Sequence, residues 1–474
     1  LQLYWTAKCL QVANDMSGRA LSPELLRKYD IRGTVGGNLD IEDARVIGRT
    51  FGSIVSEDGG KFVCIGRDGR LSSLELANAL VDGLNAAGVN VVDIGLAATP
   101  MLYFASKMLD APGAIMVTGS HNPPDYNGFK LVQRNTPFWA EDIQVLGRRA
   151  AGADWQNGTG YRIELDVLDA YIGRVAEGYE TGQELNVVWD AGNASVGPAI
   201  LALAKLLPGH HVVLNEKVDG TFPAHHPDPT IPGNLTDLIE NVCGLGYDLG
   251  VAFDGDGDRI GAVDGKGRIV WGDQLLVIYA SELLLRQPGA EIIADVKASQ
   301  VLFDEIARLG GKPVMSAPGH SVIKSMMAES GAPLAGEMSG HVFFADGYYG
   351  YDDAIYAAIR LLNIIAKSGR SLADMVSSLP KMVNTPEIRI AVSEERKFAI
   401  VDEVLSRARS DGLDINDVDG LRVNGADGWW LLRASNTENA LVVRCESVDD
   451  AGLERLKEAV SCYLAGVGVK TVAL

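Results

Sequence analysis

Short apolar runs alternate with amphipathic segments along most of the chain, and three stretches follow the same order. Each has an apolar run that ends in Asp and a small-residue loop, then a helix-like segment, then a second apolar run that ends in a polar, glycine-bearing loop. The first loops lie within residues 61–73, 185–197 and 291–300, and the second loops within 113–130, 248–260 and 333–344. This alternation predicts three copies of one α/β unit with a mixed sheet.

The last stretch differs, because from about Lys381 the pattern reads strand, helix, two strands and helix. It predicts a smaller α+β domain with an antiparallel sheet. We therefore expect four domains around a central cleft, at 21–173, 174–274, 275–380 and 381–474. We expect residues 1–20 to be an added extension, with the natural start near Met16. Ligands of open α/β sheets bind beyond the carboxyl ends of strands, so the chemistry should lie in the second loops.

Composition narrows the class of protein. Of the 474 residues 47% are hydrophobic and 22% charged, which excludes wholesale disorder. The formal charge of -20 argues against a nucleic-acid or anionic-membrane surface, so an anionic ligand needs a local basic pocket. No apolar run approaches the ~18 residues of a membrane span. The five cysteines are scattered and form no CxxC pair, which favours a reducing cytoplasm over a disulfide framework or a zinc site.

The loop at 118–130, TGSHNPPDYNGFK, is the first candidate for chemistry. Ser120 follows the apolar run GAIMV, so it lies where a strand ends. Gly119 permits a tight turn, and His121 and Lys130 bring cationic or proton-transferring groups near the hydroxyl. This set suits phosphoryl transfer at Ser120; a polar turn with a helix-capping serine is the alternative.

The loop at 254–259, DGDGDR, predicts a metal site. Asp254, Asp256 and Asp258 end the run LGVAF, with glycines between them that let the backbone fold around an ion. Oxygen ligands select a hard cation such as Mg²⁺ or Ca²⁺. An EF-hand is excluded, since its sixth and twelfth positions hold Arg259 and Gly265 here. The alternative is a solvated acidic turn, which mutual repulsion of the carboxylates disfavours.

Two further loops could bind a phosphorylated sugar. In GEMSGH, Glu337 and Ser339 can hydrogen-bond hydroxyl groups, although a plain polar turn explains this loop equally well. In RASNTE, Arg433 offers a planar fork for a phosphate, and neighbouring groups add donors. Remaining candidates, for which surface or loop roles are the alternative, are Tyr29, Arg32, Lys297 and His320.

Taken together, these loops resemble the α-D-phosphohexomutases, in particular the bacterial phosphomannomutase/phosphoglucomutase branch. The resemblance is carried in chain order by KYDIRG, TGSHNPPDYNGFK, DGDGDRI, GEMSGH and RASNTEN, and it covers the chain from about Leu25. Met338 stands where the glucosamine-phosphate branch usually has Gln. The family fold is a heart-shaped set of four domains around a cleft, which agrees with the unit pattern.

The resemblance implies an isomerase that interconverts hexose 1-phosphate and hexose 6-phosphate, with glucose and mannose as the sugars. Ser120 would carry a phosphoryl group, and a glucose 1,6-bisphosphate would be intermediate and activator. Mg²⁺ would be held by Asp254, Asp256, Asp258 and the phosphoserine. The catalytic helpers would be Lys130 as general acid/base, with a pKa lowered by surrounding cations, and Arg32, His121 and His341. The substrate-binding residues would be Tyr29, Arg259, Lys297, His320, Glu337, Ser339, Arg433, Ser435, Asn436 and Thr437.

Two other functions use parts of the same residue set. A sugar phosphatase would form the same phosphoserine and lose it to water. A non-catalytic sugar-phosphate-binding protein would need the sugar and phosphate loops, but not Ser120 together with three metal-binding carboxylates. We expect a monomeric cytoplasmic enzyme that acts on small hexose phosphates and binds neither nucleic acid nor membrane.

Overall fold

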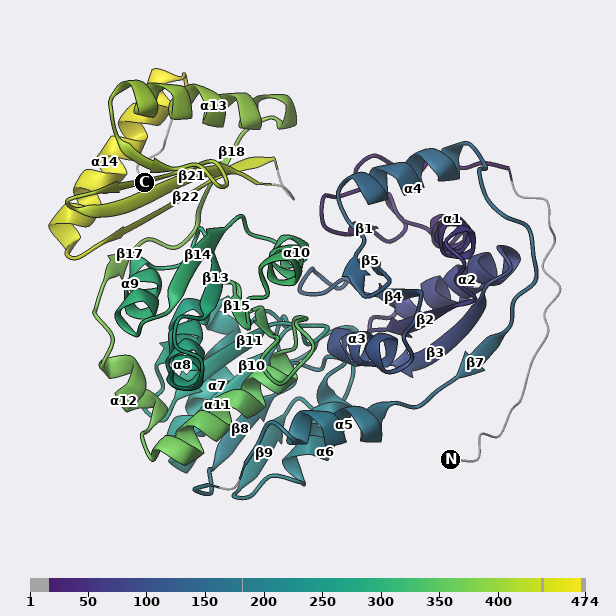
Figure 1. Cartoon of the computed structure of the whole chain (residues 1–474), viewed down its shortest axis with the longest axis horizontal. Helices are drawn as coiled ribbons and strands as arrows, with labels where there is room; N and C mark the ends of the chain where they lie inside the picture. Colours follow the sequence, from purple (N-terminus) through teal and green to yellow (C-terminus); the bar gives the residue numbers. More distant parts are fainter. Residues whose placement is uncertain (1–16, 181, 436–438, 470–474) are drawn as a thin grey trace.

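The computed structural model describes residues 17–180, 182–435 and 439–469, and its elements form four sheets (Figure 1). The first sheet has the order β1-β5-β4-β2-β3-β7, with β6 beside β5. Its strands are β1 (Ile31–Thr34), β2 (Phe62–Arg67), β3 (Asn90–Leu96), β4 (Gly113–Val117), β5 (Tyr126–Gln133), β6 (Thr136–Pro137) and β7 (Arg162–Glu164). Its helices are α1 (Ile41–Glu57), α2 (Ser73–Ala86), α3 (Thr99–Met108), α4 (Glu141–Ala151) and α5 (Leu168–Ala176).

The second and third sheets repeat the core of the first. The second has the order β12-β11-β10-β8-β9 and the third β14-β13-β15-β16. Their strands are β8 (Val187–Asp190), β9 (His211–Leu214), β10 (Leu249–Phe253), β11 (Ile260–Asp264), β12 (Ile269–Val270), β13 (Glu291–Asp295), β14 (Lys312–Ser316), β15 (Leu334–Gly336) and β16 (Val342–Phe344). Their helices are α6 (Gly197–Ala204), η1 (Pro232–Leu235), α7 (Thr236–Leu245), α8 (Gly272–Arg286), α9 (Gln300–Arg308), α10 (His320–Ser330), α11 (Ala354–Ser368) and α12 (Leu372–Ser377).

One pairing pattern recurs in these three sheets. β2 is parallel to β4, which is antiparallel to β5; β8, β10 and β11 follow the same rule, as do β13, β15 and β16. The prediction of three similar α/β units with mixed sheets is therefore confirmed. In each unit the second loop connects the two antiparallel strands, which places the Ser120, Asp254 and Glu337 loops at equivalent positions.

The last sheet is antiparallel throughout, as predicted, with the order β17-β22-β21-β20-β19 and β18 beside β22. Its strands are β17 (Val383–Asn384), β18 (Ile388–Ala391), β19 (Asp414–Asn416), β20 (Leu421–Gly425), β21 (Gly428–Ala434) and β22 (Ala440–Ser447). The helices α13 (Glu394–Ser410) and α14 (Asp450–Gly466) pack on this sheet, at the upper left of Figure 1.

The hydrophobic cores show which units are joined. One continuous cluster runs from Phe104 in α3 through Trp189 and Phe253 to Tyr279 and Phe344, so it links the first three units. The fourth domain has its own cluster, formed by α13, α14 and the inner face of the sheet. Burial of shared apolar surface stabilises the first three units as one body, whereas the fourth is a separate one.

The fourth domain is attached to the third unit by hydrogen bonds from buried arginines and by a small apolar cluster of Val296, Trp429 and Leu431. Arg422 is fully buried and donates to the carbonyls of Val296 and Ala298, each at 2.8 Å. Arg444 donates to the carbonyl of Lys297 at 2.7 Å. These bonds all reach one short loop between β13 and α9, and relative motion is the default expectation for domains joined by a small interface of mixed polarity.

Two other features bear on the predictions. In the described part of the chain no helix is long and apolar enough to cross a membrane. Arg19, inside the predicted extension, donates to Asp43 at 2.7 Å, and its backbone N–H donates to the Ala150 carbonyl at 3.0 Å. Residues 1–16 lie outside the described residues, and the exact domain boundaries stay a prediction.

Candidate active site

A cavity of about 980 Å³ lies where the four domains meet, and it collects the residues predicted from separate loops. Its walls hold a serine, cations and carboxylates from all four domains. The predicted residues that line it are Tyr29, Arg32, Ser120, His121, Lys130, Arg259, Lys297, His320, Glu337, Ser339, His341, Arg433 and Ser435. Asn436 and Thr437 lie outside the described residues.

Ser120 is the third residue of the loop that follows β4, in a conformation that few residues adopt. Its φ is +49°, in the left-handed region, and only 2% of the residue is exposed. The hydroxyl donates to Asp254 Oδ2 at 3.1 Å, and His121 Nδ1 lies 3.2 Å from Ser120 Oγ. Left-handed backbone at a non-glycine residue persists only where its surroundings hold it, and it concentrates at functional sites. The strain therefore aims the Ser120 hydroxyl at the aspartate loop.

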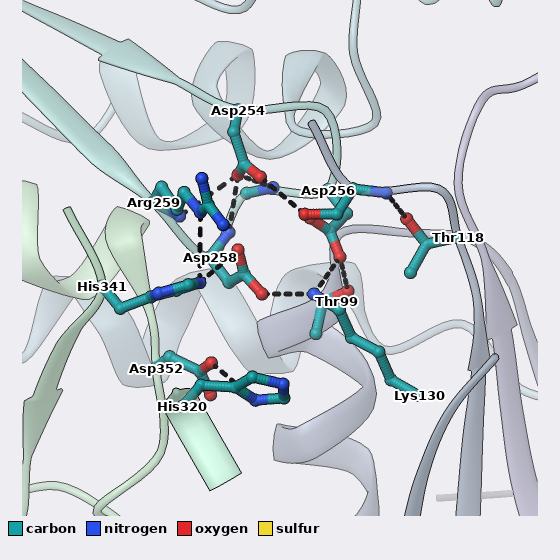
Figure 2. A network of polar contacts seen from close by, with 12 residues as sticks. Thr99, Thr118, Lys130, Asp254, Asp256, Asp258, Arg259, His320, His341 and Asp352 are labelled. Carbon is teal, nitrogen blue, oxygen red and sulfur yellow. Dashed lines mark hydrogen bonds and ion pairs between the residues drawn. The ribbon is translucent and has the colours of Figure 1, made fainter. Parts of the chain in front are cut away.

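The aspartate loop between β10 and β11 is folded around one carboxylate. Asp254 Oδ1 accepts the backbone N–H groups of Gly257, Asp258 and Arg259 at 3.0 to 3.1 Å. Its other oxygen faces Ser120. Asp254, Asp256 and Asp258 are all fully buried, and each offers one oxygen within 4.8 Å of the other two (Figure 2).

This oxygen set fits a hard divalent cation. Within the described residues, Asp256 Oδ1 is buried and has no hydrogen-bond partner, and Asp258 Oδ1 is buried and lies 3.3 Å from His341 Nε2. Burial, together with the charges of Asp258 and Asp256, raises the pKa of Asp254 well above its usual value. Buried carboxylates of this kind are paired or bind metals, and oxygen-only ligands select Mg²⁺ or Ca²⁺ over softer ions. The loop is therefore a candidate metal centre.

Lys130, on β5, sits against this loop and corrects one expectation. We expected surrounding cations to lower its pKa, but Lys130 Nζ lies 2.7 Å from Asp256 and also contacts Asp258. Although burial favours the neutral amine, these carboxylates raise the pKa of Lys130 well above its usual value. The expectation was wrong because the nearest charged groups are acidic, so the buried lysine is held as a cation.

The loop between β15 and β16 brings a histidine to the aspartate loop. His341 Nδ1 lies 2.8 Å from Glu337 Oε2, and His341 Nε2 lies 3.3 Å from Asp258. Burial opposes its charged form, but Asp258 raises the pKa of His341 from 6.5 to about 9. Burial likewise opposes the charge of Glu337, while the hydrogen bond from His341 lowers its pKa to about 2. Arg259 Nε lies 3.3 Å from His341 Nε2, and Ser339 Oγ lies 3.2 Å from His341 Nδ1.

A second histidine approaches from the N-terminus of α10. His320 Nδ1 lies 3.5 Å from Asp352 Oδ2, and Lys324 donates to the other oxygen of Asp352 at 2.9 Å (Figure 2). Burial and the charge of Lys324 lower the pKa of His320 well below its usual value. Burial and the charges of Arg259 and Arg32 do the same for His121. Both rings are therefore neutral and can accept a proton or a hydrogen bond.

The other cations line the cavity from three domains. Arg32 binds Asn122 of the serine loop and Asp30, while Tyr29 donates to the Pro318 carbonyl at 2.7 Å. Arg433, on β21, is held by Asp419. The cationic groups therefore face the cavity from the first, third and fourth domains, as a ligand with two phosphates would require.

The ion pair of Lys297 and Glu387 joins the third unit to the fourth domain, and it predicts acid sensitivity. The two charged groups lie 3.1 Å apart, and Lys297 lowers the pKa of Glu387 from 4.5 to about 2. A lowered carboxylate pKa contributes stability that is present above pH 4.5 and is lost as the pH falls towards 2. The shift corresponds to roughly 3 kcal/mol.

We therefore expect Glu387→Gln to lower the thermal unfolding temperature near neutral pH, and the difference from wild type to shrink below pH 4.5. Calorimetry from about pH 7 to about pH 3 measures it. Glu395→Gln is the control, because that residue is exposed near the start of α13 in the same domain. A difference that does not depend on pH would contradict the ion pair.

Several residues that support the site were not predicted. Thr99, at the start of α3, donates from its hydroxyl to Asp256 Oδ2 at 2.5 Å. Asp68 accepts the N–H of Gly119 at 3.1 Å, and Asp295 accepts the N–H of Met338 at 3.1 Å. Asp68 and Asp295 end the first apolar runs of their units, a pattern visible in the sequence. Nothing local in the sequence marks Thr99 or Asp352.

Comparison with known proteins agrees with this arrangement. The chain matches four family models described as "Phosphoglucomutase/phosphomannomutase": alpha/beta/alpha domains I, II and III over 23–154, 169–267 and 271–383, and the C-terminal domain over 387–461. It is 44% identical over 447 residues to a phosphomannomutase/phosphoglucomutase of Pseudomonas aeruginosa, covering 94% of this chain and 96% of that protein. It is 40% identical over 445 residues to a phosphoglucomutase of Neisseria gonorrhoeae, covering 92% of this chain and 96% of that one.

A solved structure supports the same relationship. The X-ray structure of a phosphoglucomutase/phosphomannomutase family protein from Burkholderia thailandensis superposes with a TM-score of 0.90 at 42% identity, covering 96% of this chain and 100% of that one. Matches of this extent span all four domains and every loop that lines the cavity. The chain therefore belongs to the phosphoglucomutase/phosphomannomutase family.

Proposed function

We propose that the protein interconverts hexose 1-phosphate and hexose 6-phosphate, with glucose and mannose as the sugars, through a phosphoserine at Ser120. One observation carries the proposal: the Ser120 hydroxyl, held in a strained loop, lies 3.1 Å from Asp254 at the edge of the cavity. A serine beside a candidate metal centre suits phosphoryl transfer, because positioning and charge stabilisation supply most of that catalysis. A protein that only binds sugar phosphates would not need this pair.

The transfer uses groups that face the cavity. The phosphoryl group leaves Ser120 Oγ as the bond from that oxygen to phosphorus breaks, and a bond forms to the free hydroxyl of a hexose phosphate. The hydroxyl proton passes to a base, and Lys130 is our candidate for general acid/base, with Arg32, His121 and His341 around it. Because the raised pKa holds Lys130 as a cation, it first gives a proton to the serine oxygen, and the neutral amine that this leaves takes the proton of the sugar hydroxyl.

The candidate metal centre supports this step electrostatically. Asp254, Asp256 and Asp258, with an oxygen of the phosphoserine, would hold Mg²⁺. Bound there, Mg²⁺ would offset negative charge on the transferring oxygens. Lys130 adds a positive charge beside Asp256, and Arg259, the last residue of the aspartate loop, contacts His341.

The rest of the cavity would hold the substrate. Glu337 and Ser339 would bind sugar hydroxyls, and Lys297, His320, Arg433 and Ser435 would hold the non-reacting phosphate; Asn436 and Thr437, which are outside the described residues, stay predicted phosphate-binding residues. The product of the first transfer is a 1,6-bisphosphate, glucose 1,6-bisphosphate for glucose. It turns by about half a turn and returns its other phosphate to Ser120, so the same contacts must accept either end of the sugar.

A product assay with glucose 1-phosphate and, separately, mannose 1-phosphate tests the proposal. We expect hexose 6-phosphate to form from both, and intact-mass analysis to detect a phosphate adduct on the protein. Release of inorganic phosphate in place of isomer would instead indicate a phosphatase. Binding of both sugar phosphates with neither product would indicate a binding protein. We also infer that the protein is cytoplasmic, since Cys64, Cys243, Cys445 and Cys462 are free thiols, and that it is a monomer.

Arg433→Ala should weaken substrate binding and the closure of the cavity. We infer that the fourth domain, with its separate core, moves onto bound substrate through this arginine and shuts out water. Loss of charge-assisted hydrogen bonds to a phosphate should raise KM by roughly 10- to 100-fold, with a lower kcat and more release of the bisphosphate intermediate. Steady-state kinetics with quantified glucose 1,6-bisphosphate measures all three effects.

Arg455→Ala is the matched control, because this arginine of the same domain is 56% exposed and pairs with Asp427. It should leave kinetics and bisphosphate release as in wild type. Unchanged KM and unchanged release in Arg433→Ala would remove Arg433 from the site and contradict the closure.

A further inference from the structure

Arg70 is a buried cation close to the serine loop that lies outside the cavity wall. It belongs to the first loop of the first unit, after β2, and its side chain is 0% exposed. Neither the substrate contacts nor the metal centre proposed above uses it. A guanidinium is kept in such a place only where its donors are satisfied, because burial of a charge is costly.

The donors of Arg70 all meet the serine loop or its own neighbour Asp68. Nη2 donates to the carbonyls of Ser120 at 2.7 Å and Asn122 at 2.6 Å. Nη1 donates to the carbonyls of Pro123 at 2.5 Å and Tyr126 at 3.0 Å. A single planar group thus binds four backbone oxygens, one of which belongs to Ser120 itself. The five donors of a guanidinium lie in a rigid fork, so these bonds fix the relative positions of the carbonyls.

Asp68, the ion-pair partner of Arg70, also binds the serine loop. Asp68 Oδ2 accepts the Gly119 N–H at 3.1 Å, the Thr118 hydroxyl at 2.8 Å and Arg70 Nε at 3.1 Å. Asp68 therefore accepts from the donors of the loop, while Arg70 donates to its carbonyls. Together they hold the backbone on both sides of Ser120, where φ is +49°.

Close packing leaves little room for this loop to shift. A Cβ atom at Gly119 would lie 2.5 Å from Arg70 Cζ, so the guanidinium rests directly against the loop backbone. A Cβ atom at Gly255 would lie 2.3 Å from the Ser120 carbonyl oxygen, so the aspartate loop abuts the same peptide. The ring of Phe222, from the second unit, covers the guanidinium with its centroid 5.3 Å from Arg70 Cζ.

We propose that Arg70 is the positioning residue that holds the strained backbone at Ser120, so that the serine oxygen faces Asp254 during phosphoryl transfer. This inference rests on the proposed function. A phosphoserine adds about two negative charges beside three carboxylates, which would push the loop away from the aspartates. The four bonds from Arg70 resist that displacement without any contact to substrate. Removal of Arg70 should therefore lower the rate of transfer and leave substrate binding nearly unchanged.

The substitution Arg70→Lys tests this proposal. Lysine keeps the positive charge, but its single nitrogen replaces the two guanidinium nitrogens that bind four carbonyls. We expect kcat to fall by roughly 100-fold, the effect of a misplacement of about 1 Å at a reacting group, and KM to stay near the wild-type value. The rate at which added glucose 1,6-bisphosphate phosphorylates Ser120, measured by intact-mass analysis, should fall by the same factor.

The matched control is Arg49→Lys in the same unit. Arg49 is 1% exposed, and its guanidinium lies over the ring of Trp155 at 5.1 Å, away from the serine loop. It should lower the unfolding temperature much as Arg70→Lys does but leave kcat and Ser120 phosphorylation unchanged. If Arg70→Lys does not fold, Gly119→Ala disturbs the same contact from the loop side and carries the same expectation.

Three outcomes decide the proposal. A loss of kcat and of phosphorylation rate in Arg70→Lys, with KM and the control unchanged, supports it. An unchanged kcat, or a rise in KM without loss of kcat, overturns it. If wild type phosphorylates Ser120 but does not isomerise hexose phosphates, the proposed function fails, and the phosphorylation rates alone then decide whether Arg70 positions the serine.

Discussion

Ser120→Ala should nearly abolish turnover, lowering kcat by roughly 10³-fold or more, because the oxygen that carries the phosphoryl group is gone. The fold should survive. Ser120 is 2% exposed with φ at +49°, and alanine meets the same backbone strain as serine, so only the weak hydrogen bonds of the hydroxyl are lost. Steady-state kinetics, with the unfolding temperature measured in parallel, checks both expectations.

A second buried serine provides a control for the loss of a buried hydroxyl. Ser53 is fully buried in α1 and donates to the Arg49 carbonyl at 2.8 Å, so Ser53→Ala removes a buried hydroxyl from the same unit. It should keep wild-type kcat, and Ser120→Ala should show no phosphate adduct by intact mass. If Ser120→Ala keeps most of its kcat when no bisphosphate activator is present, the phosphoserine has no role.

Removal of divalent cations should abolish activity, and added Mg²⁺ should restore it. The reason is the burial of three carboxylates, of which Asp256 keeps one oxygen without a hydrogen-bond partner among the described residues, an arrangement that a hard cation stabilises. Zn²⁺ should bind but support poor turnover, because its preference for tetrahedral geometry distorts an oxygen-rich site. Activity after exhaustive chelation and stepwise return of each metal measures this.

A second readout does not depend on turnover. A cation that binds only the folded state raises the unfolding temperature with its concentration, so Mg²⁺ should stabilise wild type. Asp256→Asn should abolish that stabilisation, whereas Asp273→Asn, outside the aspartate loop, should keep it. Full activity after chelation, or equal stabilisation of Asp256→Asn and wild type, would remove the metal from Asp254, Asp256 and Asp258.

The three α/β units and the loops that carry Ser120, Asp254 and Glu337 were predictable because their sequence signals are local. The apolar runs that lead to Ser120, Asp254 and Glu337 are contiguous in the sequence, and each is followed directly by a glycine-bearing polar loop. The spacing of the three aspartates likewise indicates oxygen ligation without knowledge of the fold. The separate core of the fourth domain agrees with the change of pattern near Lys381.

The features of the site that the sequence did not predict depend on tertiary contacts. Lys130 was expected among cations, but pairing of β4 with β5 faces it toward Asp256 and Asp258, which reverses the direction of its pKa shift. Asp352 reaches His320 only through the packing of the third unit, and an aspartate in the stretch GYYGYDD has no signature. Arg70 lies in a loop that the pattern did mark, but its partners are carbonyls, which no side-chain motif reveals.

The hydrogen bonds from strand-end carboxylates to the next loop bear on how one unit came to serve three purposes. Asp68 supports the serine loop and Asp295 the sugar loop through backbone N–H groups, while Ser195 of the second unit donates to the Gly255 carbonyl of the aspartate loop at 3.2 Å. A bond to backbone is indifferent to the side chains that the loop carries. A unit of this kind can thus carry a nucleophile, a metal ligand or a sugar contact in its second loop over the same strand, because the bonds that hold the loop backbone do not depend on the side chains that the loop presents.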